Sequence, residues 1–187
     1  MIGLIHKILF DLVHSIGGDE AVNKVKLAAL VPLETEYQLN AVYDDAEWRR
    51  LVGATCEVLG ITPDQAEAAY ADHFLKDALN RWPMWFRMSK NSRELLLRQP
   101  AIHNSLAAGV SEEAHRSAIA DKFRIDTTAD GIVTHYRSSN GHCGLYMALA
   151  RCVVNHYGDE ADIEERQCAK RGAEECEIHV RWTHFKV

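Results

Sequence analysis

The chain has 187 residues, a formal net charge of −6, 47% hydrophobic residues and 26% charged residues. These values are ordinary for a globular protein with a substantial core, and the negative charge without a basic run argues against nucleic acid as a partner. The apolar start carries His6, Lys7 and Asp11, so we expect neither a signal peptide nor a membrane span, and we predict a cytoplasmic protein. Five cysteines, an odd number, argue against a secreted disulfide framework and leave room for metal or redox chemistry.

The first hundred residues are predicted to be mainly helical. Apolar residues recur at spacings of three and four over residues 2–16, and Gly17-Gly18 is expected to end this helix. Asp19 is suited to cap the next helix. Residues 31–44 are expected to form a loop.

More helices follow from the same periodicity and from terminal signals. They are predicted over residues 44–60, 62–82 and 90–109. The second has Thr62 as its cap and Pro63 at its first helical position, which is a strong start signal. The third contains Pro100, which removes one backbone hydrogen bond and is expected to bend the helix just before His103.

Beyond residue 117 the pattern changes to short strands. Residues 121–139 predict two strands, 144–158 an amphipathic helix, and 161–182 a second hairpin that turns near Arg171-Gly172. Helices followed by a β-β-α-β-β order predict an α+β fold, with helices segregated from an antiparallel sheet. We expect one domain over residues 1–187, with a mainly helical part at 1–110 and a β-β-α-β-β part at 117–187.

His103 is a candidate metal ligand. It lies among Ala, Ile, Asn, Ser and Leu in the stretch "RQPAIHNSLAAG", with no carboxylate in the five residues after it. A lone histidine on such a helix is most often a partly buried residue bonded to a carbonyl. A neutral imidazole in an apolar, acid-free setting also suits the axial position of a porphyrin iron.

The segment "HYRSSNG", residues 135–141, is a candidate site for carboxylates. Tyr136 and Ser138 have the same parity in an extended segment, so their side chains are expected on one face. With the nearby Arg137 they could hold carboxylates such as porphyrin propionates. The alternative is an ordinary polar turn between a strand and a helix.

Three cysteines are candidate ligands for a metal. Cys168 and Cys176 flank Gly172 at equal distances, so they are expected to face each other across the last hairpin, with Cys143 as a third partner. They could share a metal, form a disulfide or remain unliganded thiols. Glu165, three residues before Cys168, is a candidate fourth ligand, although its parity in an ideal strand is wrong.

No catalytic set is found in the sequence. There is no Gly-x-Ser-x-Gly element, no Gly-rich phosphate loop and no metalloprotease helix. We therefore do not expect an enzyme.

Several of these segments together resemble the heme nitric oxide/oxygen-binding (H-NOX) family. The resemblance rests on the order and spacing of "MIGLIHKILFDLV", the helix with His103, "HYRSSN" and "CAKRGAEECEIHVRW". It covers nearly the whole chain. It implies a helical part and a part with an antiparallel sheet, heme b between them, and His103 as the proximal iron ligand.

The resemblance also assigns the residues that hold the porphyrin. The family's Tyr-x-Ser-x-Arg motif grips the propionates and matches Tyr136, Ser138 and Asn140, so an asparagine stands in place of the arginine. Asparagine cannot make a charged bidentate pair with a propionate. The distal positions match the apolar residues Ile5, Leu9, Phe74 and Leu145. Because the tyrosine of oxygen-binding members falls at Leu145, the resemblance implies a sensor of nitric oxide rather than of oxygen.

Bacterial members of the family often bind zinc, and Cys143, Cys168 and Cys176 match that cysteine cluster, with Glu165 where those members have a histidine.

Stand-alone members act on a separate histidine kinase or cyclic-di-nucleotide enzyme, so a partner in trans is expected. Two alternatives remain. One is a heme-free small-molecule-binding module related to 4-vinyl-reductase-like domains, and the other is a thiol- or zinc-based redox sensor.

Overall fold

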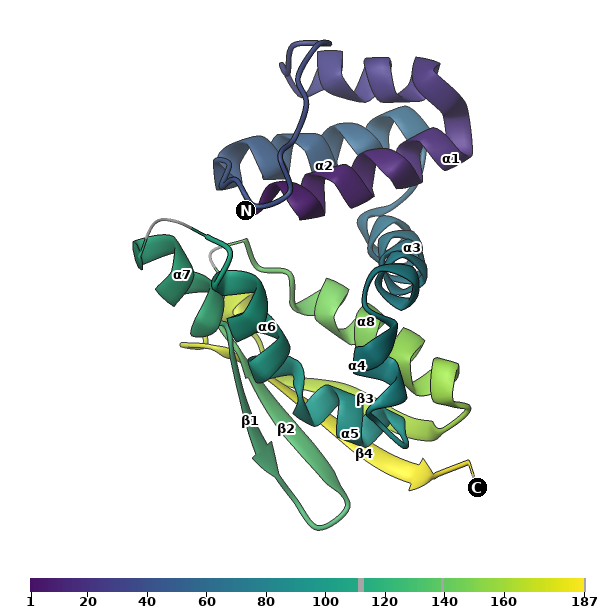
Figure 1. The fold of residues 1–187 in the computed structure, drawn as a ribbon, viewed down its shortest axis with the longest axis vertical. Helices are drawn as coiled ribbons and strands as arrows, with labels where there is room; N and C mark the ends of the chain where they lie inside the picture. Colours follow the sequence, from purple (N-terminus) through teal and green to yellow (C-terminus); the bar gives the residue numbers. More distant parts are fainter. Residues whose placement is uncertain (111–112, 139, 187) are drawn as a thin grey trace. The chain divides into compact units, whose positions relative to one another are not determined.

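The structure is a computed structural model that describes residues 1–110, 113–138 and 140–186 (Figure 1). It divides into two compact units, Met1–Phe74 and Leu75–Val187. The boundary lies within a helix, so the helices that follow residue 83 belong to the same unit as the sheet. Among the described residues, no helix combines the length and the apolar character that crossing a membrane requires.

The first unit is helical, as expected. Helix α1 (Gly3–Ala28) changes direction at Gly18, whose φ of 63° and ψ of −165° are not helical. The predicted stop at this glycine is therefore a kink between two helical segments. Helix α2 (Asp45–Leu59) begins after Asp44, whose side chain accepts a hydrogen bond from the Ala46 backbone, and ends at Gly60 in the left-handed region.

Helix α3 (Pro63–Arg81) begins with the predicted signal. The Gln65 backbone N–H donates to the Thr62 hydroxyl at 3.2 Å, and the Thr62 backbone N–H donates to Oε1 of Gln65 at 2.9 Å. This reciprocal pair is a capping box, which satisfies two donors that the first helical turn leaves free.

The second unit begins with the last part of α3, which is followed by short helices. Helix α4 (Pro83–Arg87) and helix α5 (Ser92–Leu97) are followed by α6 (Gln99–Ala107) and α7 (Glu113–Ala120). The single helix predicted over 90–109 is therefore wrong, because α5 ends at Leu97 and α6 starts anew with Pro100 in its first turn. Proline is favoured there since the first N–H groups of a helix have no partner within the helix.

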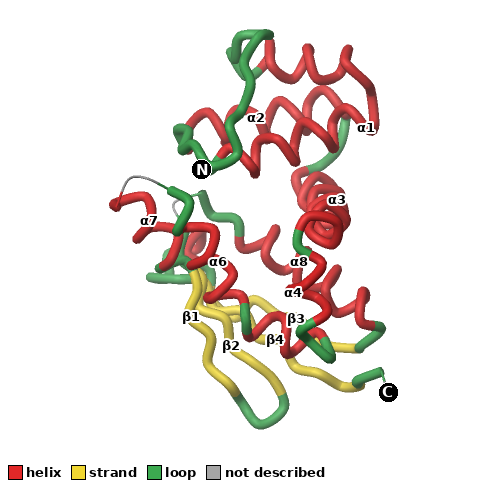
Figure 2. Tube along the Cα trace, viewed as in Figure 1, coloured by secondary structure: helices red, strands yellow, loops and turns green. Residues whose placement is uncertain are grey.

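A four-stranded antiparallel sheet forms the rest of this unit (Figure 2). Its order is β1 (Phe123–Thr127), β2 (Gly131–Tyr136), β4 (Cys176–His184) and β3 (Glu160–Gln167), and α8 (Cys143–Tyr157) connects β2 to β3. The α+β prediction is confirmed. The connection between the two strands of the last hairpin is longer than predicted, since it contains a 3-10 turn, Ala169–Arg171, before Gly172.

One face of the sheet is buried and the other is charged. Ile132, Thr134 and Tyr136 of β2 are buried, and Ile178 and Val180 of β4 lie on the same face. The buried face packs against α5 and α8, which contribute two specific bonds. The Trp182 indole donates to the Ser92 hydroxyl at 2.8 Å, and the Tyr146 and Thr134 hydroxyls are 2.7 Å apart.

Candidate functional site

His103 lies on α6 and is mostly buried, with its ring against the ring of Phe123 at the start of β1. The two ring centroids are 4.5 Å apart and the planes are tilted by 52°. Burial, aided by the positive charge of Lys122, lowers the pKa of His103 to about 4. The imidazole is therefore neutral at pH 7, which leaves a nitrogen lone pair available.

The Nδ1 atom of His103 is buried and has no hydrogen-bond partner among the described residues. An unsatisfied buried nitrogen costs on the order of 1–3 kcal/mol, so native structures rarely leave one without a reason. The residues around His103 thus fit an axial ligand of a heme: a neutral ring in an apolar setting, not committed to a protein carbonyl. Sequence reasoning found His103 but not Phe123, because nothing in the sequence connects a strand residue with a helix twenty positions earlier.

Tyr136, Ser138 and Asn140 come together at the end of β2. The Asn140 backbone N–H donates to the Ser138 hydroxyl at 3.2 Å. Burial raises the pKa of Tyr136 to about 12, and hydrogen bonds from Ser138 and the His142 backbone act in the opposite direction. Tyr136, Ser138 and Asn140 thus place a phenol, a hydroxyl and an amide in one short segment, all of them groups that can hydrogen-bond to a carboxylate.

Arg137 is not part of this group. Its Nε donates to Oε2 of Glu175 at 2.9 Å, and its Nη2 donates to Oε1 of Glu174 at 3.4 Å. The charged face of the sheet also carries His135, which is 2.8 Å from Glu175 and 3.1 Å from Asp126. Alternation along the strand therefore directs the Arg137 side chain away from Tyr136 and gives it carboxylate partners.

The four residues matched to the distal side are apolar and lie on three helices. In the first unit, Leu9 is buried on α1, the Ile5 carbonyl accepts a hydrogen bond from the Tyr70 hydroxyl at 3.0 Å, and the Phe74 ring lies 6.2 Å from that of Tyr70. In the second unit, Leu145 is half-buried on α8.

Tyr146, the neighbour of Leu145, has its hydroxyl group engaged elsewhere. The 2.7 Å bond to Thr134 ties it to β2, and burial raises its pKa to about 12. Its ring packs 5.5 Å from Phe123 and 6.3 Å from Tyr136. Tyr146 is thus a core residue that packs against the buried face of the sheet.

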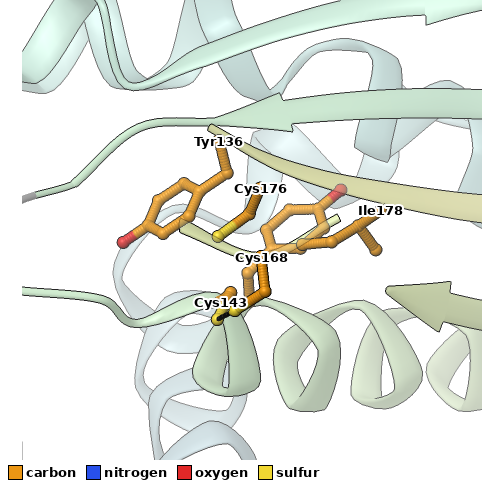
Figure 3. Packing of buried hydrophobic residues seen from close by; sticks show 6 residues of the cluster. Tyr136, Cys143, Cys168, Cys176 and Ile178 are labelled. Atoms are coloured by element: carbon orange, nitrogen blue, oxygen red, sulfur yellow. Dashed lines mark hydrogen bonds between the residues drawn. The ribbon is translucent and has the colours of Figure 1, made fainter. Parts of the chain in front are cut away.

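Cys143, Cys168 and Cys176 form one buried group, the thiol cluster (Figure 3). Cys143 begins α8, Cys168 follows β3 and Cys176 begins β4. The Sγ atoms of Cys143 and Cys168 are 3.7 Å apart, and the Sγ of Cys176 accepts a hydrogen bond from the Ala169 backbone at 3.3 Å. None of these three cysteines forms a disulfide bond. Burial raises the pKa of Cys143 and Cys176 above that of an ordinary thiol, so both are protonated at pH 7 when nothing is bound.

Glu165 joins the thiol cluster through an irregularity in β3. The pairing with β4 shifts between Glu165 and Gln167, so the parity that an ideal strand imposes no longer applies. One ligand atom of Glu165 and the three sulfurs all lie within 4.8 Å of one another. The Oε1 of Glu165 is buried with no described partner, while its Oε2 pairs with Arg171 at 3.2 Å. Three thiolates with one oxygen ligand can complete a tetrahedral zinc site.

His179 does not contribute to the thiol cluster. It lies on the opposite face of β4, where its ring bonds to Glu177 at 2.5 Å. The alternation of an extended strand holds here, since Cys176 and Ile178 are buried and Glu177 and His179 are only partly covered.

Solved structures with the same architecture are H-NOX proteins. A variant H-NOX protein from S. oneidensis in the Fe(II) state has a TM-score of 0.84 and 16% identity, and the match covers 100% of this chain and 98% of that chain. Unliganded Fe(II) H-NOX from K. algicida has a TM-score of 0.77 and 20% identity over 100% and 99% of the chains. An oxygen-binding H-NOX domain related to soluble guanylate cyclases has a TM-score of 0.77 and 14% identity over 99% and 96%.

The fold is therefore that of an H-NOX domain, a heme-based gas-sensor domain that is generally not catalytic. The family model for haem-NO-binding (HNOB) matches residues 2–165, and the chain belongs to this family. The resemblance noted in the sequence is confirmed. No curated protein sequence matches the chain.

Proposed function

We propose that the chain binds heme b through His103, senses nitric oxide and signals to a separate protein in the cytoplasm. The observation that carries the proposal is the state of His103, which is neutral and partly buried, with a buried Nδ1 atom that has no partner among the described residues. When bound, the heme would supply an open coordination position for a diatomic gas. Tyr136, Ser138 and Asn140 would hold the propionates as neutral hydrogen-bonding groups.

The preference for nitric oxide follows from the residues assigned to the distal side. Ile5, Leu9, Phe74 and Leu145 offer no hydrogen-bond donor from their side chains. The hydroxyl of Tyr146 is bonded to Thr134. Bound oxygen carries a partial negative charge that a donor stabilises, whereas nitric oxide depends far less on such a bond. A histidine kinase or a cyclic-di-nucleotide enzyme is the proposed partner class.

An absorption spectrum of the purified full chain, before and after reconstitution with heme, tests this proposal. We expect a Soret band that shifts on addition of nitric oxide to the reduced protein and does not shift in air-saturated buffer on the timescale of mixing. No Soret band after reconstitution would favour the heme-free binding module of the same fold. A stable oxygen complex would contradict the assignment of the distal residues.

A second proposal concerns the thiol cluster. We propose that Cys143, Cys168, Cys176 and Glu165 hold a zinc ion, which is supported by ligand atoms within 4.8 Å of one another and by the unpartnered Oε1 of Glu165. Because the cluster joins the start of α8 to the end of β3 and the start of β4, a bound zinc ion would tie these three elements together. Elemental analysis of protein purified without added metal, together with a thiol count, tests it.

A further inference from the structure

The segment between residues 81 and 98 has a charge opposite to that of the chain. It contains five basic residues and one acidic residue, a formal charge of +4, whereas the whole chain has −6. The basic residues are Arg81, Arg87, Lys90, Arg93 and Arg98. They are spaced three to six positions apart, so no basic run is visible in the sequence. Arg81, Arg87 and Lys90 lie in or within three residues of the short helix α4, and Arg98 donates to the Met88 carbonyl that follows this helix.

Helix α4 also exposes apolar side chains. Met84 and Met88 are 56% and 54% exposed and lie one helical turn apart. In the same segment, the Trp82 and Trp85 rings stack on each other, with centroids 4.5 Å apart and an interplanar angle of 19°. We call Trp82, Met84, Trp85 and Met88, together with Arg87 and Lys90, the α4 patch. Tryptophan, methionine and arginine are enriched at protein interfaces, and methionine adapts readily to a partner's shape.

Two cations of the segment are available to a partner. Arg81 is bound by Asp77 in a bidentate pair, and Arg93 donates to the Thr128 and Gly131 carbonyls. In contrast, Arg87 and Lys90 are exposed, and neither side chain makes an ion pair with any described residue. An apolar surface with unpaired positive charges at its rim is complementary to an acidic, amphipathic partner.

We propose that the α4 patch is the docking surface for an acidic amphipathic segment of a separate protein. The patch is a poor fit for a second copy of the chain, because a two-fold interface would bring Arg87 and Lys90 of both copies together. Two free cations are also fewer than the clusters of roughly 4–8 basic residues that recognise anionic lipid. The inference rests on the proposal that the chain acts on a partner in trans.

The α4 patch is tied to the helix that carries His103. Arg98 lies at the junction between α5 and α6, and its Nη2 donates to the Met88 carbonyl at 3.0 Å. The start of α5 is fixed on the core, since both the backbone and the hydroxyl of Ser92 donate to the buried carboxylate of Asp159. A displacement of α6 would therefore be transmitted through Arg98 to a partner on the α4 patch.

The test uses the full chain and a labelled synthetic amphipathic peptide of leucine and glutamate, with a lysine-for-glutamate peptide for comparison. We expect fluorescence anisotropy to show binding of the acidic peptide only, weakening as salt is raised. The Arg87→Glu/Lys90→Glu protein is expected to bind about tenfold more weakly or worse. The control Arg151→Glu/Lys186→Glu has the same charge change at exposed sites elsewhere and is expected to stay within about twofold.

A photocrosslinker locates the bound peptide. Benzoylphenylalanine at Met84 is expected to capture it, whereas the same group at Leu30, which is 81% exposed, is not. Thermal melting checks that each variant is folded. Equal affinity in the Arg87→Glu/Lys90→Glu protein, or equal capture at Leu30, would overturn the proposal.

Other occupants of the α4 patch would be recognised by their own signatures. Binding to phosphatidylserine vesicles that is lost in Arg87→Glu/Lys90→Glu would contradict the proposal and indicate that the patch binds a lipid surface. Self-association that is lost in the same variant would likewise contradict the proposal and indicate that the patch binds a second copy of the chain. Neither readout depends on heme, so a failure of the docking proposal is distinguishable from a failure of the gas-sensor proposal.

Discussion

The ring of Phe123 lies 4.5 Å from the ring of His103 and 5.0 Å from the ring of Tyr136, measured between centroids. This one side chain therefore joins the helix of the proposed iron ligand to the buried face of the sheet. It also contributes to the burial that keeps His103 neutral.

The stability of the heme-free protein is expected to fall as the pH is lowered from about 6.5 to about 4. Burial lowers the pKa of His103 from 6.5 to about 4 in the folded state, so the unfolded chain binds more protons in this range. The part of the free energy of unfolding that depends on a neutral His103 is fully present above pH 6.5 and is lost by about pH 4. Its upper limit is about 3 kcal/mol. Urea unfolding across this range measures it.

The matched variant for this prediction is His103→Leu, which keeps an apolar side chain and removes the titration. We expect its stability to vary less with pH over the same interval. His6 also has a lowered pKa because it is buried, so some slope remains. An identical pH dependence in the wild type and in His103→Leu would show that His103 is not neutral by burial.

Replacing His103 with alanine is expected to abolish stable heme binding. The variant removes the proposed protein ligand and leaves a space that free imidazole can fill. We therefore expect loss of the Soret band and its recovery on addition of imidazole. His14→Ala, at an exposed position on α1, serves as the control with unchanged heme content. An unchanged Soret band and heme stoichiometry in His103→Ala would rule out the assignment.

Introducing arginine at Asn140 is expected to tighten heme retention. A guanidinium near Tyr136 and Ser138 would add a charge-assisted bond to a propionate, about 1.5–3 kcal/mol or roughly tenfold or more in affinity. The rate of heme transfer to an acceptor protein measures the change. Arg137→Ala is the comparison and is expected to leave this rate unaltered, because Arg137 pairs with Glu175. Faster heme loss in Arg137→Ala would instead show that Arg137 reaches the porphyrin.

The fourth ligand at the thiol cluster is tested by Glu165→Gln. An amide is a weaker zinc ligand than a carboxylate, so we expect lower zinc content by elemental analysis, whereas Glu165→His is expected to keep the metal. Cys176→Ser is expected to lose it, with Cys56→Ser on α2 as the control outside the cluster. Zinc-free wild-type protein with reactive thiols, and unchanged melting in Cys176→Ser, would mean that the three cysteines are only packing residues.

The two units differ in how far their elements were predictable. The start of α3 depends on Thr62, Pro63 and Gln65, and the end of α2 on Gly60; each of these signals acts within a few residues, so sequence reasoning located both boundaries. The break between α5 and α6 was harder to predict. A proline within an apolar run is compatible with a bend or with a new helix, and the packing of α5 on the core decides between them.

Local patterns in the sequence predicted the α+β class, the candidate ligand His103 and the pair Tyr136 and Ser138, and the spacing of the cysteines indicated their cluster. Periodicity, turn residues and strand parity are local properties of the chain, so no tertiary contact was needed for these predictions. The tertiary structure was needed to show that Glu165 reaches the thiol cluster through a shifted register, that Arg137 is held by Glu175, and that Phe123 packs against His103. These three features depend on the pairing of segments far apart in the sequence. The free energy of such pairing comes from burial and from partners that no local pattern specifies.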